Sequence, residues 1–178
     1  FCAKNIVNDS TYYLFTVGNG GSSPPHNGLH YSVFDMNLNN GLGDISPGMK
    51  NIPVPDADSA FNLLYGTRHL NNRDVWVVVK QHPVMSSTWP YMSFLLTANG
   101  FNANPVISPS YLGRNGLASN EGTIRISPDG TKLICLGQEG TNGRHGEFCQ
   151  FNNISGEVNP LFLFIPSNGP YPPYSPYW

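Results

Sequence analysis

The sequence of 178 residues is poor in charge, because Lys, Arg, Asp and Glu together make up only 11% of it. An average soluble domain has roughly 25%. Coiled coils and charged helical bundles need abundant Ala, Glu, Lys and Leu, so this composition excludes them. Nine basic and 11 acidic residues leave no cationic field, which argues against nucleic-acid binding. The chain contains no apolar run long enough to cross a bilayer, so we expect no membrane insertion.

Cysteine is also scarce. Cys2, Cys135 and Cys149 show no C-x-x-C spacing, so a zinc site is not expected. Cys135 and Cys149 fall on two neighbouring predicted strands, roughly opposite each other. A cross-strand disulfide and two buried free thiols are both open at this point, and the redox compartment stays undecided.

Motifs for catalysis and phosphate binding are missing too. The sequence holds no G-x-S-x-G, no G-x-x-x-x-G-K-[ST] and no H-E-x-x-H, so we expect no catalytic residue, no cofactor and no metal. A composite histidine site remains conceivable, since His26, His82 and His145 fall in equivalent loops of the pattern described next.

What the chain does have is turn-forming and apolar residues. It contains 19 Gly, 16 Pro and 21 Asn, and hydrophobic residues make up 39%. Abundant β-branched and aromatic residues argue against disorder, and Gly, Pro and Asn are typical of tight turns. Together they predict an all-β, extracellular protein.

Four strand-like stretches recur three times in the same order. The first stretches are 1–7, 60–69 and 122–127; the second are 12–17, 74–80 and 131–137; the third are 29–36, 91–97 and 146–151; the fourth are 49–54, 104–108 and 160–165. Polar turns such as Pro128-Asp129-Gly130 precede the second stretches and favour hairpins. Prolines in the fourth stretches suit edge strands.

The pattern predicts three four-stranded antiparallel units, at about 1–55, 56–110 and 111–165, followed by a tail at 166–178. Four-stranded sheets repeated radially are the blades of a β-propeller. A β-sandwich could also be drawn from the same twelve strands, but the register of the repeat favours the propeller. Three units are too few for a closed ring, so we expect a fragment of a longer protein, or a subunit completed by a partner.

Several segments carry a family resemblance. Ile126-Ser-Pro-Asp-Gly-Thr-Lys-Leu-Ile134 resembles the S-P-D-G hairpin of TolB-like and WD40-like propellers. The ordered set 12–17, 28–44, 74–79, the S-P-D-G segment and 151–158 is similar to the N-terminal propeller region of large secreted Bacteroidota proteins, of the kind linked to type IX secretion and gliding motility. The resemblance implies a secreted or cell-surface bacterial protein with a role in adhesion, and it supplies no catalytic residues.

Long loops between second and third strands are expected on one face, together with the connections between units. Function tends to lie on such loops. Residues that this face would offer to a ligand or partner are Trp89, Tyr91, Tyr111, Arg114, Arg144 and His145. Trp89 has two possible placements: exposed, where it could stack on a sugar or dock a protein, or folded back over the sheet edge.

The tail is rich in proline and aromatic residues, which favours an extended polyproline-like conformation. Tyr171, Tyr174, Tyr177 and Trp178 fit an arm that docks on a neighbour, and a plain linker is the alternative.

These observations favour a non-enzymatic segment for adhesion or protein assembly, whose partner is a second copy, a neighbouring domain or another chain. A glycan-binding, lectin-like module on the long-loop face is the alternative, and a propeller enzyme is less favoured.

Overall fold

The computed structural model describes residues 1–18, 28–81, 89–111, 122–139 and 143–164. In these residues the regular secondary structure is β-strand, apart from one turn of 3-10 helix at Asn39–Gly41. All strand pairs are antiparallel and form three separate sheets. The expected all-β class is therefore confirmed. In the described ranges no helix is long and apolar enough to span a membrane.

Each sheet is built from strands that are consecutive in the chain. Sheet 1 contains β1 (Cys2–Lys4), β2 (Thr11–Val17), β3 (Leu29–Asp35), β4 (Asp44–Ile45) and β5 (Ile52–Pro53). Sheet 2 contains β6 (Ala60–Arg68), β7 (Val75–Gln81), β8 (Tyr91–Thr97) and β9 (Gly100–Ser108). Sheet 3 contains β10 (Gly122–Ile126), β11 (Lys132–Glu139), β12 (Gly143–Phe151) and β13 (Val158–Phe164).

The fourth strand of sheet 1 differs from the single stretch expected at 49–54. Two short segments, β4 and β5, pair in turn with β3. Between them a turn at Ser46–Met49 stays hydrogen-bonded to β3. The Val33 N–H donates to the Met49 carbonyl at 2.9 Å, and the Val33 carbonyl accepts the Ser46 N–H at 2.8 Å. Pro47 lacks a backbone donor and Gly48 has a φ of 74°, so the chain turns here instead of extending.

The expected Ser-Pro-Asp-Gly hairpin joins β10 to β11. The Gly130 N–H donates to the Ser127 carbonyl at 2.8 Å, and Gly130 has a φ of 67°, a conformation that glycine adopts without strain. The Asp129 carboxylate accepts the Thr131 N–H at 3.1 Å and the Ser127 hydroxyl at 2.5 Å. The turn is therefore fixed by residues within the motif itself.

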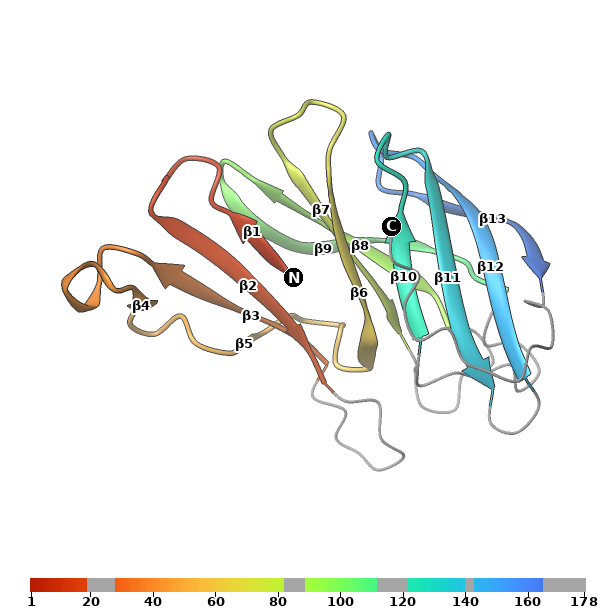
Figure 1. Ribbon diagram of the computed structural model, residues 1–178, viewed down its shortest axis with the longest axis horizontal. Coiled ribbons are helices and arrows are strands. Elements are labelled where there is room, and N and C mark those ends of the chain that lie inside the picture. Colours follow the sequence, from red (N-terminus) through yellow and green to blue (C-terminus); the bar gives the residue numbers. More distant parts are fainter. Residues whose placement is uncertain (19–27, 82–88, 112–121, 140–142, 165–178) are drawn as a thin grey trace.

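The three sheets stack face to face, in chain order from left to right in Figure 1. Strand β6 contacts both β2 and β10, which places sheet 2 in the middle. Its strands β7 and β8 are buried on both faces, so most of their residues are apolar. A three-layer stack differs from the two-sheet β-sandwich considered from the sequence.

Two apolar clusters fill the gaps between the sheets. Between sheets 1 and 2 the cluster includes Phe15, Leu29, Val77, Val79 and Phe94. Between sheets 2 and 3 it includes Trp76, Val78, Trp89, Leu133 and Cys149. Since side chains alternate along a strand, β7 sends Val77 and Val79 toward sheet 1 and Trp76 and Val78 toward sheet 3.

The strand ends that flank the long loops lie together, as expected. Val17 pairs with Leu29, Gln81 with Ala60, and Tyr91 with Ser108. We call this end of the sheets the loop end. The opposite end holds the tight hairpins, such as Ser127–Gly130.

Candidate functional site

Two of the residues that the sequence analysis offered as ligand or partner contacts at the loop end are buried. Trp89 is 3% exposed and Tyr91 0%, and both belong to the cluster between sheets 2 and 3. This corrects the expectation that Tyr91 presents its ring to a ligand. Of its two placements, Trp89 takes the one turned back into the protein, because burying so large an apolar side chain between two sheets removes it from water.

The other expected residues are only partly placed. Tyr111 is 37% exposed, and His145 lies half-buried on β12, opposite Gly137. For Arg144 the structure describes the backbone alone, paired with Gln138. Outside the described residues lie Arg114, His26, His82 and the tail residues Tyr171, Tyr174, Tyr177 and Trp178.

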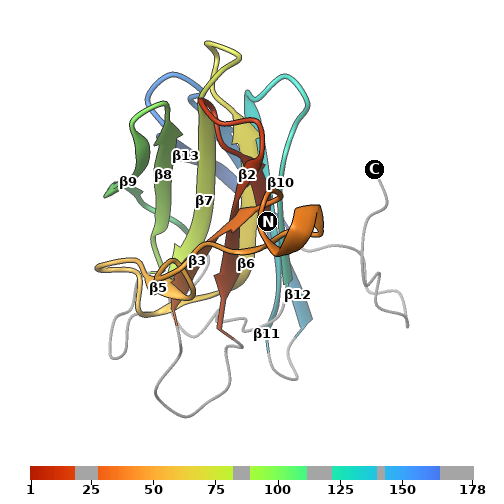
Figure 2. The ribbon, with the colours of Figure 1, turned by 90° about the vertical axis from the view of Figure 1, so that its left-hand side faces the viewer.

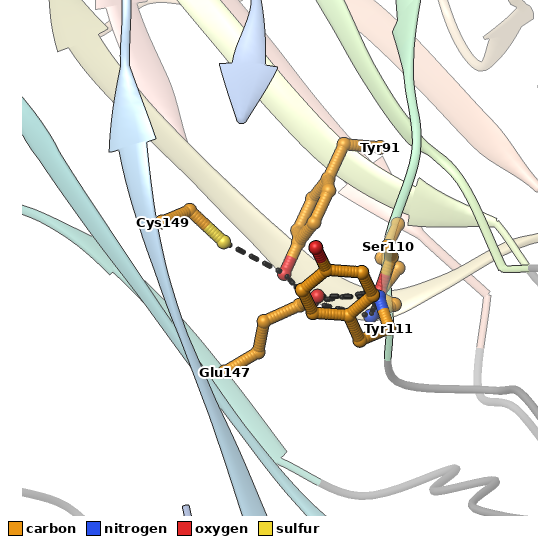
Figure 3. A network of polar contacts seen from close by, with 6 residues as sticks. Tyr91, Ser110, Tyr111, Glu147 and Cys149 are labelled. Atoms are coloured by element: carbon orange, nitrogen blue, oxygen red, sulfur yellow. Dashed lines mark hydrogen bonds and ion pairs between the residues drawn. The ribbon is translucent and has the colours of Figure 1, made fainter. Parts of the chain in front are cut away.

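A buried polar network lies near the loop end, between sheets 2 and 3 (Figure 3). Lys80 stands near the end of β7, Tyr91 begins β8, Ser110 follows β9, and Glu147 projects from β12. The fold thus brings Tyr91 close to three residues that the sequence analysis did not select. We call Lys80, Tyr91, Ser110 and Glu147 the buried network.

Glu147 is the common acceptor in this network. Its Oε2 accepts the Tyr91 hydroxyl at 2.6 Å and the Ser110 hydroxyl at 2.8 Å, while Oε1 accepts the backbone N–H of Tyr111. The Lys80 Nζ donates to the Ser110 Oγ at 2.5 Å and lies 3.5 Å from Glu147 Oε2. It also sits 4.7 Å from the centroid of the Tyr91 ring.

Lys80 and Glu147 form an ion pair that is removed from water, with 1% and 0% of their side chains exposed. Burying two charges is costly, and only their mutual attraction and further hydrogen bonds offset that cost. The hydroxyls of Tyr91 and Ser110 provide these bonds. Because Glu147 belongs to sheet 3 and the other three residues to sheet 2 and the segment after it, the network fastens one sheet to the other.

Alternation along the strands could have placed each of these two charges on a buried face. Lys80 shares its face of β7 with Trp76 and Val78, and Glu147 shares its face of β12 with Cys149 and Phe151. A charge on the buried face of a sheet is costly unless a group of opposite charge pairs with it. Two stacked sheets that each bury one charge are therefore expected to pair them. The sequence does not state which sheets stack, so spacing alone could not join the two.

Cys135 and Cys149 are both buried and free. They are not opposite each other, which corrects the expected register: Cys135 faces Glu147 and Cys149 faces Leu133. The Cys149 Sγ lies 3.9 Å from the Tyr91 hydroxyl. Burial raises the pKa of the Cys135 and Cys149 thiols and of the Tyr91 hydroxyl, because it disfavours their charged forms.

The burial of these thiols predicts selective labelling. With excess iodoacetamide at neutral pH, the folded chain takes up one label, at the exposed Cys2, because thiol reactivity needs the thiolate and access to solvent. In denaturant all three cysteines react. Peptide mass spectrometry locates the labels, and rapid modification of Cys149 without denaturant would contradict the placement.

The described residues contain no group of three or more His, Cys, Asp and Glu side chains placed to hold a metal ion. His26 and His82 of the composite histidine site lie outside these residues, so that site stays a sequence hypothesis.

A second feature of interest is the face of sheet 3 that points away from sheet 2. In one row across the sheet Ile134 pairs with Phe148 and Phe148 with Phe162; in the next, Leu136 pairs with Gly146 and Gly146 with Phe164. We call Ile134, Leu136, Phe148, Phe162 and Phe164 the outer face of sheet 3.

This outer face is both apolar and accessible. Phe162 is 52% exposed, and its ring stacks 5.4 Å from that of Phe148. The Phe164 ring lies over Gly146, where a Cβ would meet ring atoms at 2.2 Å. Lys132, Gln150 and Asn159 form a polar row beside it. Contiguous exposed apolar area with a polar border is typical of protein interaction sites.

No protein-family model, no curated protein and no solved structure matches the chain.

Proposed function

We propose that this chain is a non-enzymatic, propeller-like segment of a secreted or cell-surface bacterial protein, which acts in protein assembly or adhesion. The observation that carries the proposal is the outer face of sheet 3. It presents three phenylalanines and two aliphatic residues in two adjacent rows, and Phe162 alone leaves about half of its side chain in water. Covering such a face with another protein surface is favourable.

The way the sheets stack supports the same function. Both buried gaps join the face of one sheet to the face of the next, and the outer face of sheet 3 has the same kind of residues as those buried faces. The resemblance to secreted Bacteroidota propellers supports the cellular setting. A lectin-like role has less support, because its expected anchor Trp89 is buried.

Site-specific photo-crosslinking tests the proposal. A photoreactive phenylalanine analogue replaces Phe162, and cells producing the protein are irradiated. We expect covalent adducts with protein at this position. A matched control places the analogue at Leu42, which is 77% exposed but lies outside the outer face of sheet 3, and we expect few adducts there. Absence of adducts at Phe162, or equal yields at both positions, would contradict an assembly role.

A further inference from the structure

We infer that the outer face of sheet 3 is covered by sheet 1 of a second copy of this chain, so that two copies close on each other. The inference rests on the proposed function and names its partner. It assigns a docking role to two faces at once, one at each end of the stack.

The stack has a consistent direction. The face of sheet 1 that carries Phe15 meets sheet 2 at Val77 and Val79, and the other face of sheet 2, with Trp76 and Val78, meets sheet 3. Each sheet therefore packs on the sheet that follows it in the chain through one face, which we call its forward side, and on the preceding sheet through the opposite face, its backward side. The outer face of sheet 3 is a forward side. A further layer in the same stack would therefore meet it with the backward side of a sheet.

Sheet 1 offers such a backward side. Along one row Tyr12 pairs with Phe34 and Phe34 with Ile45, and Leu14 lies in the next row beside Ser32. Because side chains alternate on β2, Tyr12 and Leu14 point away from Phe15 and sheet 2. We call Tyr12, Leu14, Phe34 and Ile45 the outer face of sheet 1; all four are partly exposed, and Figure 2 looks toward this side of the molecule.

The two outer faces match in layout. On sheet 3 a row runs from Arg125 through Ile134 and Phe148 to Phe162. On sheet 1 a row runs from Lys4 through Tyr12 and Phe34 to Ile45. Each row has one basic residue on the first strand and three apolar residues on the following strands. Each row crosses the second strand of its sheet, β2 or β11, within the first three residues of that strand. The two rows therefore lie at similar distances from the ends of their sheets.

A closed pair of copies is favoured over an open-ended chain of copies, because only a closed arrangement covers every outer face. A contact between two different faces is heterologous, and it forms a closed ring only when the rotation between copies closes. Radially stacked four-stranded sheets close with about four to eight members. Two copies, each with the three sheets of the described residues, would make six and would cover both outer faces through two equal contacts. A contact of sheet 3 with sheet 3 would leave both outer faces of sheet 1 in water.

Light scattering coupled to gel filtration tests this dimer in the purified chain. We expect the unaltered chain to elute with twice the 19.5 kDa mass of one copy. Phe162→Glu and Leu14→Glu each place a charge in one of the two faces, and each should weaken dimerisation by about 30-fold or more. Leu70→Glu is the matched control, since Leu70 is 59% exposed and follows β6 of the middle sheet, and this variant should stay dimeric.

Mixing the two variants gives the sharper result. In an equimolar mixture, sheet 3 of Leu14→Glu and sheet 1 of Phe162→Glu are both unaltered, so one intact contact can form and dimers reappear. A monomeric unaltered chain overturns the inference, and so does a Leu14→Glu variant that stays dimeric. Circular dichroism verifies folding, and Phe162→Ser with Leu14→Ser replace any variant that fails to fold.

The outcome is separable from that of the proposed function. If crosslinks from position 162 join the chain to other proteins and the purified chain is monomeric, the assembly role stands and the second copy is excluded. If the crosslinks themselves are missing, both proposals fail.

Discussion

Replacing Lys80 with methionine is expected to lower the free energy of unfolding by about 3–5 kcal/mol. The reason is that Glu147 stays behind, 0% exposed, without the one cation that the described residues place beside it. Its bonds to Tyr91 and Ser110 remain, but neutral donors do not replace the charge. Urea denaturation followed by tryptophan fluorescence, at one fixed protein concentration, measures the loss.

The double variant Lys80→Met/Glu147→Leu is the control for this result. It removes both charges, so much of the loss should be recovered, because well-packed apolar residues often replace a buried ion pair at little cost. A double variant as unstable as Lys80→Met would show that the packing of the Lys80 stem, and not the unpaired carboxylate, determines the effect.

Two serines provide a finer comparison in the same unfolding experiment. Ser110 both accepts from Lys80 and donates to Glu147, whereas the Ser93 hydroxyl is buried without a hydrogen-bond partner in the described structure. Ser110→Ala should therefore cost about 1–3 kcal/mol, and Ser93→Ala should be neutral or stabilising. Equal losses in both variants would contradict a special role for the buried network.

Local signals explain why so much of the fold could be predicted. Strand alternation and turn residues act over a few positions, and the Ser127–Gly130 hairpin is held by bonds among its own residues. The order of strands within each sheet follows because consecutive antiparallel strands need only short turns. The prediction of the fourth strand of sheet 1 was less accurate, because the turn at Ser46–Met49 depends on hydrogen bonds to Val33 in another strand.

The candidate sites depend on contacts that no local pattern contains. Lys80 and Glu147 meet only because sheet 2 stacks on sheet 3 through one particular face of each. The outer face of sheet 3 is hidden in a similar way: β13 carries apolar residues on both sides, and a bulge at Phe148 and Cys149 shifts its register. The sequence therefore predicts an edge strand there, but does not say that Phe148 and Phe162 form one surface.

Trp89→Ala tests which of the two placements considered for Trp89 the protein adopts. An exposed indole would affect binding and leave stability nearly unchanged. The buried side chain, 3% exposed among residues such as Ile124 and Leu133, predicts a loss of about 3–5 kcal/mol in the free energy of unfolding, from lost burial and the cavity left behind. Thermal and urea denaturation measure it.

Phe162→Ala is the matched control for that variant, because it truncates an aromatic residue that is 52% exposed. Measured at a concentration where the chain is monomeric, it should change stability by about 0.5 kcal/mol or less. A small loss in both variants would return Trp89 to the surface and restore the case for a ligand at the loop end. A large loss at Trp89 alone assigns the indole to the gap between sheets 2 and 3, and it leaves the proposal for the two outer faces unchanged.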